Sequence, residues 1–154
     1  LNEMKNITKS KLILGIAIII TTVSVIILGL VLLWIYQPTN VLEVKNSPFP
    51  VRIVNDGSNK IVVMHVNYCK NSKKEGTVRV SYVSKSQETF LPMSPENGPK
   101  TCLETDIPII IPKDLPPDNY KIKFRVTYDI NPLKKGVVAE FESQEFDLTT
   151  LKTQ

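Results

Sequence analysis

Residues 120–130 read YKIKFRVTYDI, and this stretch decides the fold class because apolar and polar side chains alternate along it. Lys121, Lys123 and Arg125 begin the polar set. A period of two places successive side chains on opposite faces of a β-strand, so the stretch predicts a strand with one buried and one solvated face. The residues expected on the buried face are Tyr120, Ile122, Phe124, Val126, Tyr128 and Ile130.

Shorter stretches on both sides of this strand have a similar composition and are separated by turn residues such as Asn55-Asp56-Gly57. Phe141 and Phe146 are out of phase along one of these stretches, so a β-bulge near Ser143 would be needed to bury both rings. The pattern predicts an all-β domain, an immunoglobulin-like or fibronectin-like β-sandwich of roughly seven or eight strands, with a single crossed barrel as the alternative. Besides 120–130, strands are expected within residues 41–44, 49–54, 60–69, 77–84, 105–111 and 137–148.

The two cysteines, Cys69 and Cys102, lie at the end of one expected strand and just before another. In an oxidising compartment they are expected to form a disulfide, which would stabilise the domain by about 3–4 kcal/mol on the chain-entropy model. The spacing does not match the pair that joins facing strands in immunoglobulin domains. It suggests a clip between a strand end and a loop, and the alternative is two unpaired thiols.

Residues 12–36 read LILGIAIIITTVSVIILGLVLLWIY and contain no charged residue. As a helix this run would be about 37 Å long, enough to cross a hydrocarbon layer of about 30 Å, and only a helix satisfies its own backbone in lipid. Trp34 and Tyr36 stand at its end, where aromatic rings favour a membrane interface. The run therefore predicts a transmembrane helix. The alternative, a cleaved signal peptide, is disfavoured by the length and by the absence of small residues at the end.

The orientation follows from the lysines at residues 5, 9 and 11, because the first charge after the apolar run is Glu43. The positive-inside rule predicts a cytoplasmic tail over residues 1–11, the transmembrane helix over 12–36, and a domain over 37–154 on the periplasmic or extracellular side.

The composition offers little for catalysis or for nucleic-acid binding. The net charge of +4 arises partly from the N-terminal lysines, and the rest of the chain is nearly balanced, unlike a nucleic-acid binder. His65, the one histidine, is expected on the solvated face of a strand. No nucleophile, phosphate-loop or zinc motif accompanies it. We therefore predict a protein that is not an enzyme, with no catalytic residue, no cofactor and no metal ligand.

The basic stripe, defined as Lys121, Lys123 and Arg125, is the one candidate interaction surface that the sequence indicates. We expect these side chains to pair across the sheet with Glu140 and Glu142, at under about 1 kcal/mol each. The alternative is a contact with an acidic partner or with lipid head groups.

Several segments of the expected domain resemble a group of small uncharacterised membrane-anchored β-sandwich proteins of tailed bacteriophages. Asn119 departs from that group, where a glycine is common at this position. The resemblance implies a phage or prophage gene and a domain in the periplasm or at the surface of a bacterial host, without a known activity or known functional residues. The segments that carry it are 68–70 (YCK), Cys102, 111–120 (IPKDLPPDNY), 128–133 (YDINPL) and 141–146 (FESQEF).

Two roles from different classes fit these features. The first is a membrane-anchored, non-enzymatic interaction module with an unknown protein partner in the host envelope, since sandwich domains commonly present loops or edges to partners. The second is a holin or antiholin that controls lysis. The helix lacks the polar residues that a pore lining requires, which favours the first role. An envelope hydrolase is disfavoured by the missing catalytic constellation.

Overall fold

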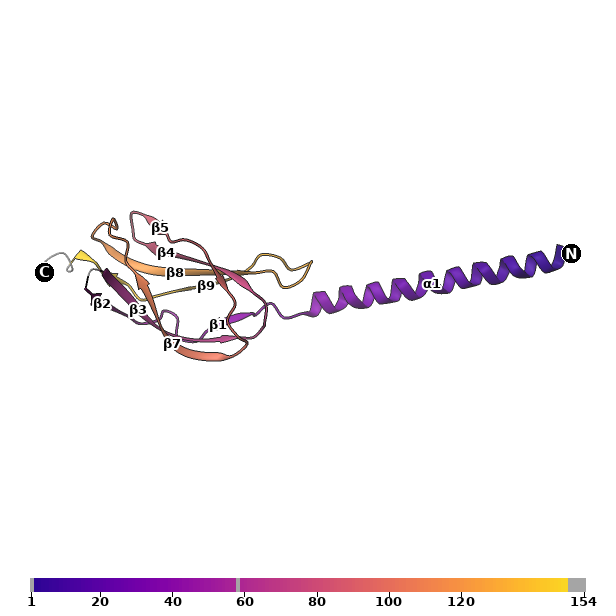
Figure 1. Ribbon diagram of the computed structural model, residues 1–154, viewed down its shortest axis with the longest axis horizontal. Helices are drawn as coiled ribbons and strands as arrows, with labels where there is room; N and C mark the ends of the chain where they lie inside the picture. Colours follow the sequence, from indigo (N-terminus) through magenta and orange to yellow (C-terminus); the bar gives the residue numbers. More distant parts are fainter. Residues whose placement is uncertain (1, 58, 150–154) are drawn as a thin grey trace. The chain divides into compact units, whose positions relative to one another are not determined.

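The computed structural model describes residues 2–57 and 59–149, with side chains from residue 11 onward (Figure 1). The chain divides after Pro38 into two units, a helix and a β-rich domain. Most of the domain is strand, so the expectation of an all-β fold behind an N-terminal apolar helix is confirmed.

Helix α1 (Asn2–Tyr36) begins ten residues before the expected membrane span, because nothing in residues 2–11 interrupts a helix. From Lys11 to Tyr36 it is long and apolar enough to cross a membrane, and no part of its most apolar stretch is buried inside the protein. The hydroxyls of Thr21, Thr22 and Ser24 donate to carbonyls four residues earlier, at 2.8–2.9 Å, so these polar groups are satisfied within the helix. Between Leu12 and Tyr36 the helix therefore presents almost only hydrocarbon to its surroundings.

The domain contains two antiparallel sheets. In the first, β3 pairs with β1 and β2 along one edge and with β7 along the other. In the second, β8 pairs with β9 and β10 along one edge and with β4 along the other, and β4 also carries β5 and β6. The strands of the first sheet are β1 (Leu42–Val44), β2 (Val51–Asp56), β3 (Asn59–Lys70) and β7 (Cys102–Ile110). Those of the second are β4 (Gly76–Val83), β5 (Glu88–Phe90), β6 (Ser94–Glu96), β8 (Asn119–Tyr128), β9 (Val137–Glu142) and β10 (Phe146–Asp147).

Two strands, β5 and β6, were not expected from the sequence, and the described residues form ten strands where about seven or eight were predicted. Each has three residues, too short to show a period of two. Their place on the edge beyond β4 is set by pairing with that strand rather than by their own composition. Two facing antiparallel sheets are consistent with the predicted sandwich.

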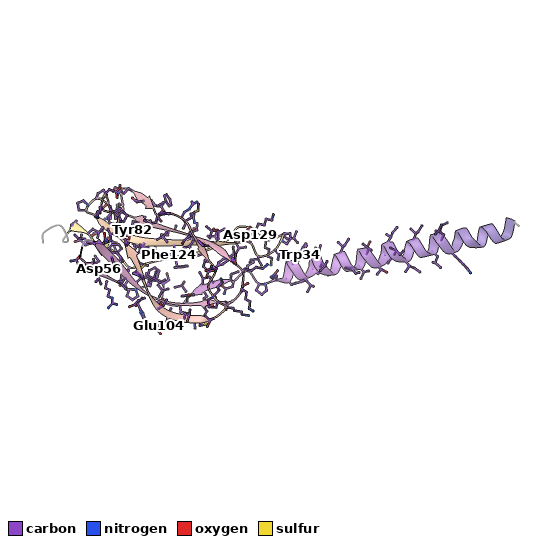
Figure 2. The ribbon with its side chains drawn as sticks, in the orientation of Figure 1. Trp34, Asp56, Tyr82, Glu104, Phe124 and Asp129 are labelled. Carbon is purple, nitrogen blue, oxygen red and sulfur yellow. A yellow bond between two sulfur atoms is a disulfide. The ribbon has the colours of Figure 1, made fainter. Side chains whose placement is uncertain are left out.

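The core lies between the two sheets, and the inward face of strand β8 is buried in it as predicted. The inward side chain of Phe124 packs against Phe49 and Phe141, with ring centroids 5.8 and 5.3 Å away. Figure 2 shows Phe124 and Tyr82 inside the domain and Glu104 at its periphery. Aromatic pairs of this kind add about 0.5–1.5 kcal/mol beyond the area they bury. All six residues expected on the buried face of residues 120–130 are less than one tenth exposed.

Two buried tyrosines make hydrogen bonds that hold loops and strands in place. The Tyr120 hydroxyl, at the start of β8, donates to the Pro116 carbonyl at 2.9 Å, which ties the β7–β8 connection to the strand. The Tyr82 hydroxyl donates to the Ile110 carbonyl at 3.2 Å and joins the two sheets. Burial raises the pKa of Tyr82 far above its ordinary value, so this donor stays protonated.

The predicted β-bulge is present at Ser143. Lys123 pairs with Glu142 and Tyr120 pairs with Phe146, so the bulged side has one residue more than β8 between these two pairs. The Ser143 backbone N–H donates to the Ile122 carbonyl, and the Ser143 hydroxyl accepts from the Ile122 N–H, both at 2.9 Å. The extra residue restores the phase, which turns Phe146 into the core.

Cys69 and Cys102 form a disulfide, with their Cα atoms 3.9 Å apart. The expected clip between a strand end and a loop is wrong, because β7 begins at Cys102 and the two cysteines are directly paired residues of neighbouring strands. The first residues of β7 are exposed and not apolar in alternation, so their strand character comes from pairing with β3.

Candidate functional site

The basic stripe lies on the outer face of the second sheet and is paired as predicted. Lys121 contacts Glu142 at 3.2 Å, and Lys123 contacts Glu140 at 3.3 Å. Arg125 directs two guanidinium nitrogens at the same Glu140 oxygen. Hydrogen bonds from Arg125 and then from Lys123 lower the pKa of Glu140 below its ordinary value, so this carboxylate stays charged.

The stripe continues onto strand β4 through Arg79, which stands directly opposite Arg125. Arg79 lies over the Phe90 ring at 5.7 Å, and the described part of the chain offers it no carboxylate. Two arginines side by side raise the local positive charge, and the side chains of the stripe remain about 36–49% exposed. This face can therefore meet an acidic group, although Glu140 and Glu142 already balance two of its four positive charges.

A second polar cluster lies on the outer face of the first sheet, around His65. The ring Nδ1 lies 2.9 Å from Asp106 Oδ1, and the ring Nε2 lies 2.7 Å from Glu104 Oε1. A carboxylate only accepts hydrogen bonds, and a neutral imidazole has one N–H. Both bonds can therefore form together only when His65 is the doubly protonated imidazolium.

The electrostatics of this cluster agree with its geometry. Hydrogen bonds to Asp106 and then to Glu104 raise the pKa of His65, and the His65 hydrogen bond is the largest cause that lowers the pKa of Asp106. Arg52 contacts the other Asp106 oxygen at 2.9 Å. His65 is on the solvated face, as expected, but no sequence pattern indicated its two partners. The register between β3 and β7 places Asp106 directly opposite His65, and Glu104 two residues along.

A buried ion pair joins the two sheets at the opposite end of β3 from the β2–β3 turn. The Lys70 side chain is fully buried, and its Nζ lies 2.6 Å from Glu96 Oε2 and 2.8 Å from the Gly98 carbonyl. The Tyr128 hydroxyl donates to the same Glu96 oxygen at 3.0 Å, and the ammonium lies 5.9 Å from the Tyr128 ring centre. Sequence reasoning missed this group, although Lys70 continues the inward phase of Val62 and Met64.

These clusters do not form a catalytic centre in the residues that the structure describes. Both nitrogens of His65 are engaged by carboxylates, which leaves neither in contact with a serine hydroxyl. The same part of the chain contains no group of three histidine, cysteine or acidic residues placed to hold a metal ion. The two clusters on the outer faces present charged side chains to solvent.

No model of a known protein family matches the chain. No curated protein matches it either.

Proposed function

We propose that this protein is a membrane-anchored interaction module, in which α1 holds the sandwich domain at a membrane and the domain binds a protein partner. The observation that carries the proposal is the apolar stretch of α1 from Lys11 to Tyr36, which is long enough to cross a membrane and has no buried residue in its most apolar part. Such a surface requires lipid. The lysine-bearing end is proposed to remain in the cytoplasm, with the domain in the periplasm or outside the cell, where its disulfide would persist.

The sandwich is proposed to be of the immunoglobulin-like type. Taking β1 and β2 as the first strand and β9 and β10 as the last, the sheets follow the orders A-B-E and C′-C-F-G, with β5 and β6 as C′. The Tyr120 hydrogen bond to Pro116 supports this assignment, since immunoglobulin-like domains bear a tyrosine at the start of strand F that binds the backbone just upstream. Domains of this class serve mainly in adhesion and recognition, which fits a binding role.

A phage or prophage origin and a partner in the host envelope belong to the same proposal and rest on the segments that resemble phage proteins. No enzymatic activity, cofactor or nucleic-acid ligand is proposed. The domain would act by binding an envelope component, and the helix would keep the domain at a high local concentration near that component.

The test is affinity capture with the full chain in host membranes, alongside a permeability assay after expression of the chain alone. We expect specific capture of an envelope protein and an intact membrane. Membrane permeabilisation that depends on the chain, or that changes when a lysis enzyme is expressed with it, would instead support the lysis-control role. If α1 fused to an unrelated domain captured the same envelope protein equally well, a binding role for the sandwich domain would be contradicted.

A further inference from the structure

A groove separates the edge of the first sheet from the edge of the second, between strands β1 and β9. Strand β1 pairs only with β3, and β9 pairs only with β8, among the described residues. Each strand therefore has one edge that faces the groove. The apolar side chains that line it come from both strands: Val41, Leu42, Val44, Val137, Ala139 and Phe141.

Two residues of β9, Val138 and Glu140, direct their backbone N–H and C=O groups toward this groove without a hydrogen-bond partner among the described residues. The Glu142 carbonyl points away from β8, since it accepts from the Phe49 N–H at 3.2 Å. Alternate residues of an antiparallel strand face the same edge, so Val138 and Glu140 also direct their N–H and C=O groups away from β8. Nothing in the described chain pairs with those four groups.

Strand β1 offers the same arrangement on the other side. The Val41 carbonyl accepts from the Asn71 N–H, and the Lys45 N–H donates to the Asn67 carbonyl, so these residues face β3. By the same alternation, the backbone groups of Leu42 and Val44 face away from β3. The groove is thus lined by both apolar and polar side chains, the latter including Thr39, Asn40 and Ser47, and has an unpaired strand edge along each side.

One part of the same edge is already occupied, which shows how an added segment would be held. Phe49 forms an isolated parallel bridge with Ser143, and the Phe49 carbonyl accepts from the Gln144 N–H at 2.9 Å. The extended segment around Phe49 therefore caps the edge just beyond β9. From Glu140 toward Val138, the same edge of β9 has no such segment paired with it among the described residues.

We propose that this groove binds an extended peptide segment of a partner protein by β-strand addition along β9. The segment would form main-chain hydrogen bonds with Val138 and Glu140 and insert alternate apolar side chains against the lining. Glu140 and Glu142 beside β9 are already paired with the basic stripe, whereas Glu43 on β1 makes no ion pair among the described residues. A segment that brings a basic residue near Glu43 is therefore favoured. This inference rests on the proposed function, because it names the kind of partner and the place where it binds.

The first test needs no partner and uses hydrogen–deuterium exchange on the full chain in lipid nanodiscs. The amides of Val138 and Glu140 are expected to exchange at least about a hundredfold faster than those of Ala139 and Phe141, which are bonded to β8. Equal protection of all four amides would overturn the proposal, because the edge would then be closed.

The second test uses a synthetic peptide of about nine residues that alternates valine and lysine, as the probe for strand addition. A control peptide has the same composition with the valines in one block. The alternating peptide should slow exchange at Val138 and Glu140 at least about tenfold, and the control should not. Equal protection by both peptides, or by neither, would overturn the proposal.

A pair of variants at one position separates the backbone contribution from the side chain. Val138→Pro removes an N–H that faces the groove but none that bonds β8, whereas Val138→Ala retains it. Peptide binding should fall at least about tenfold in Val138→Pro and stay within about twofold in Val138→Ala. Unchanged binding in Val138→Pro would sink the inference, provided that circular dichroism shows both variants folded.

The same variants keep this inference distinct from the proposed function. If wild-type protein captures an envelope partner and Val138→Pro captures it equally well, the groove proposal fails while the binding role stands. If wild-type protein captures nothing but binds the alternating peptide, the role proposed for the whole chain fails while the groove stands.

Discussion

At the scale of single residues, the charged side chains fall into groups with different surroundings. The basic stripe and the His65 cluster lie on outer faces, where water screens each pair and limits its contribution to stability. Lys70 is fully buried, and its ammonium has a carboxylate, a carbonyl and an aromatic ring around it. The two settings lead to different expectations for substitution and for pH.

His65 is expected to titrate above its ordinary value of 6.5. Since its folded pKa is raised, the hydrogen bonds that need the imidazolium are fully present below the unfolded pKa and are lost as the pH rises through the folded pKa. An NMR titration of the ring protons should show the raised pKa, and Asp106→Asn should lower it, because the largest cause is removed. A His65 pKa that is the same in both proteins would contradict the cluster as described.

Removing Lys70 should be far more costly than removing a surface lysine. Lys70→Met leaves the Glu96 carboxylate without its cation and should lower the free energy of unfolding by about 3 kcal/mol. Adding Glu96→Leu should restore much of that loss, since an apolar pair replaces the stranded charge. Chemical denaturation of the full chain in detergent micelles measures both. Lys123→Gln serves as the surface control. If Lys70→Met were as stable as Lys123→Gln, the buried pair would be refuted.

At the scale of elements, pairing with a neighbouring strand makes strands of segments whose own sequence has no strand pattern. Apolar alternation is absent from strands β5 and β6 and from the start of β7. These segments are strands because β5 and β6 pair with β4, and β7 pairs with β3. The bulge at Ser143 and the capping segment at Phe49 close part of the edge beside β9. The disulfide joins β3 to β7 at the end where the buried ion pair also lies.

The cysteines should react with a thiol reagent only after reduction. The bond closes a loop across a separation of 33 residues, so reduction is expected to lower the free energy of unfolding by about 3–4 kcal/mol on the chain-entropy model. Mass spectrometry of alkylated protein with and without a reductant gives the first result, and denaturation gives the second. Prompt labelling of Cys69 in unreduced protein isolated from the envelope would contradict the bond.

At the scale of the whole molecule, the chain consists of one largely apolar helix and one domain of two sheets, with different surfaces. The helix carries no charged residue from Leu12 to Tyr36, whereas the domain has its own core and charged outer faces. If the helix lies in a membrane, as proposed, a partner bound by the domain would be held near that membrane.

The proposed orientation can be tested by adding protease to intact spheroplasts. Cleavage beyond Pro38 is expected, while a tag placed before Lys5 should stay protected until the membrane is permeabilised. The tag serves as the internal control for membrane integrity. Protection of the domain in intact spheroplasts would reverse the orientation and remove the oxidising compartment on which the disulfide depends.

The length and lack of charge of residues 12–36 were sufficient for the helix. The spacing of apolar side chains along one segment was sufficient for the inward face of β8 and for the bulge. The pairing of the basic stripe with Glu140 and Glu142 also followed, since both sets lie on long, well-patterned strands. The partners of His65 and Lys70, the position of Cys102 within a strand and the groove beside β9 did not follow. They depend on strand register and on the distance between sheet edges, which arise only when segments distant in the chain pack together.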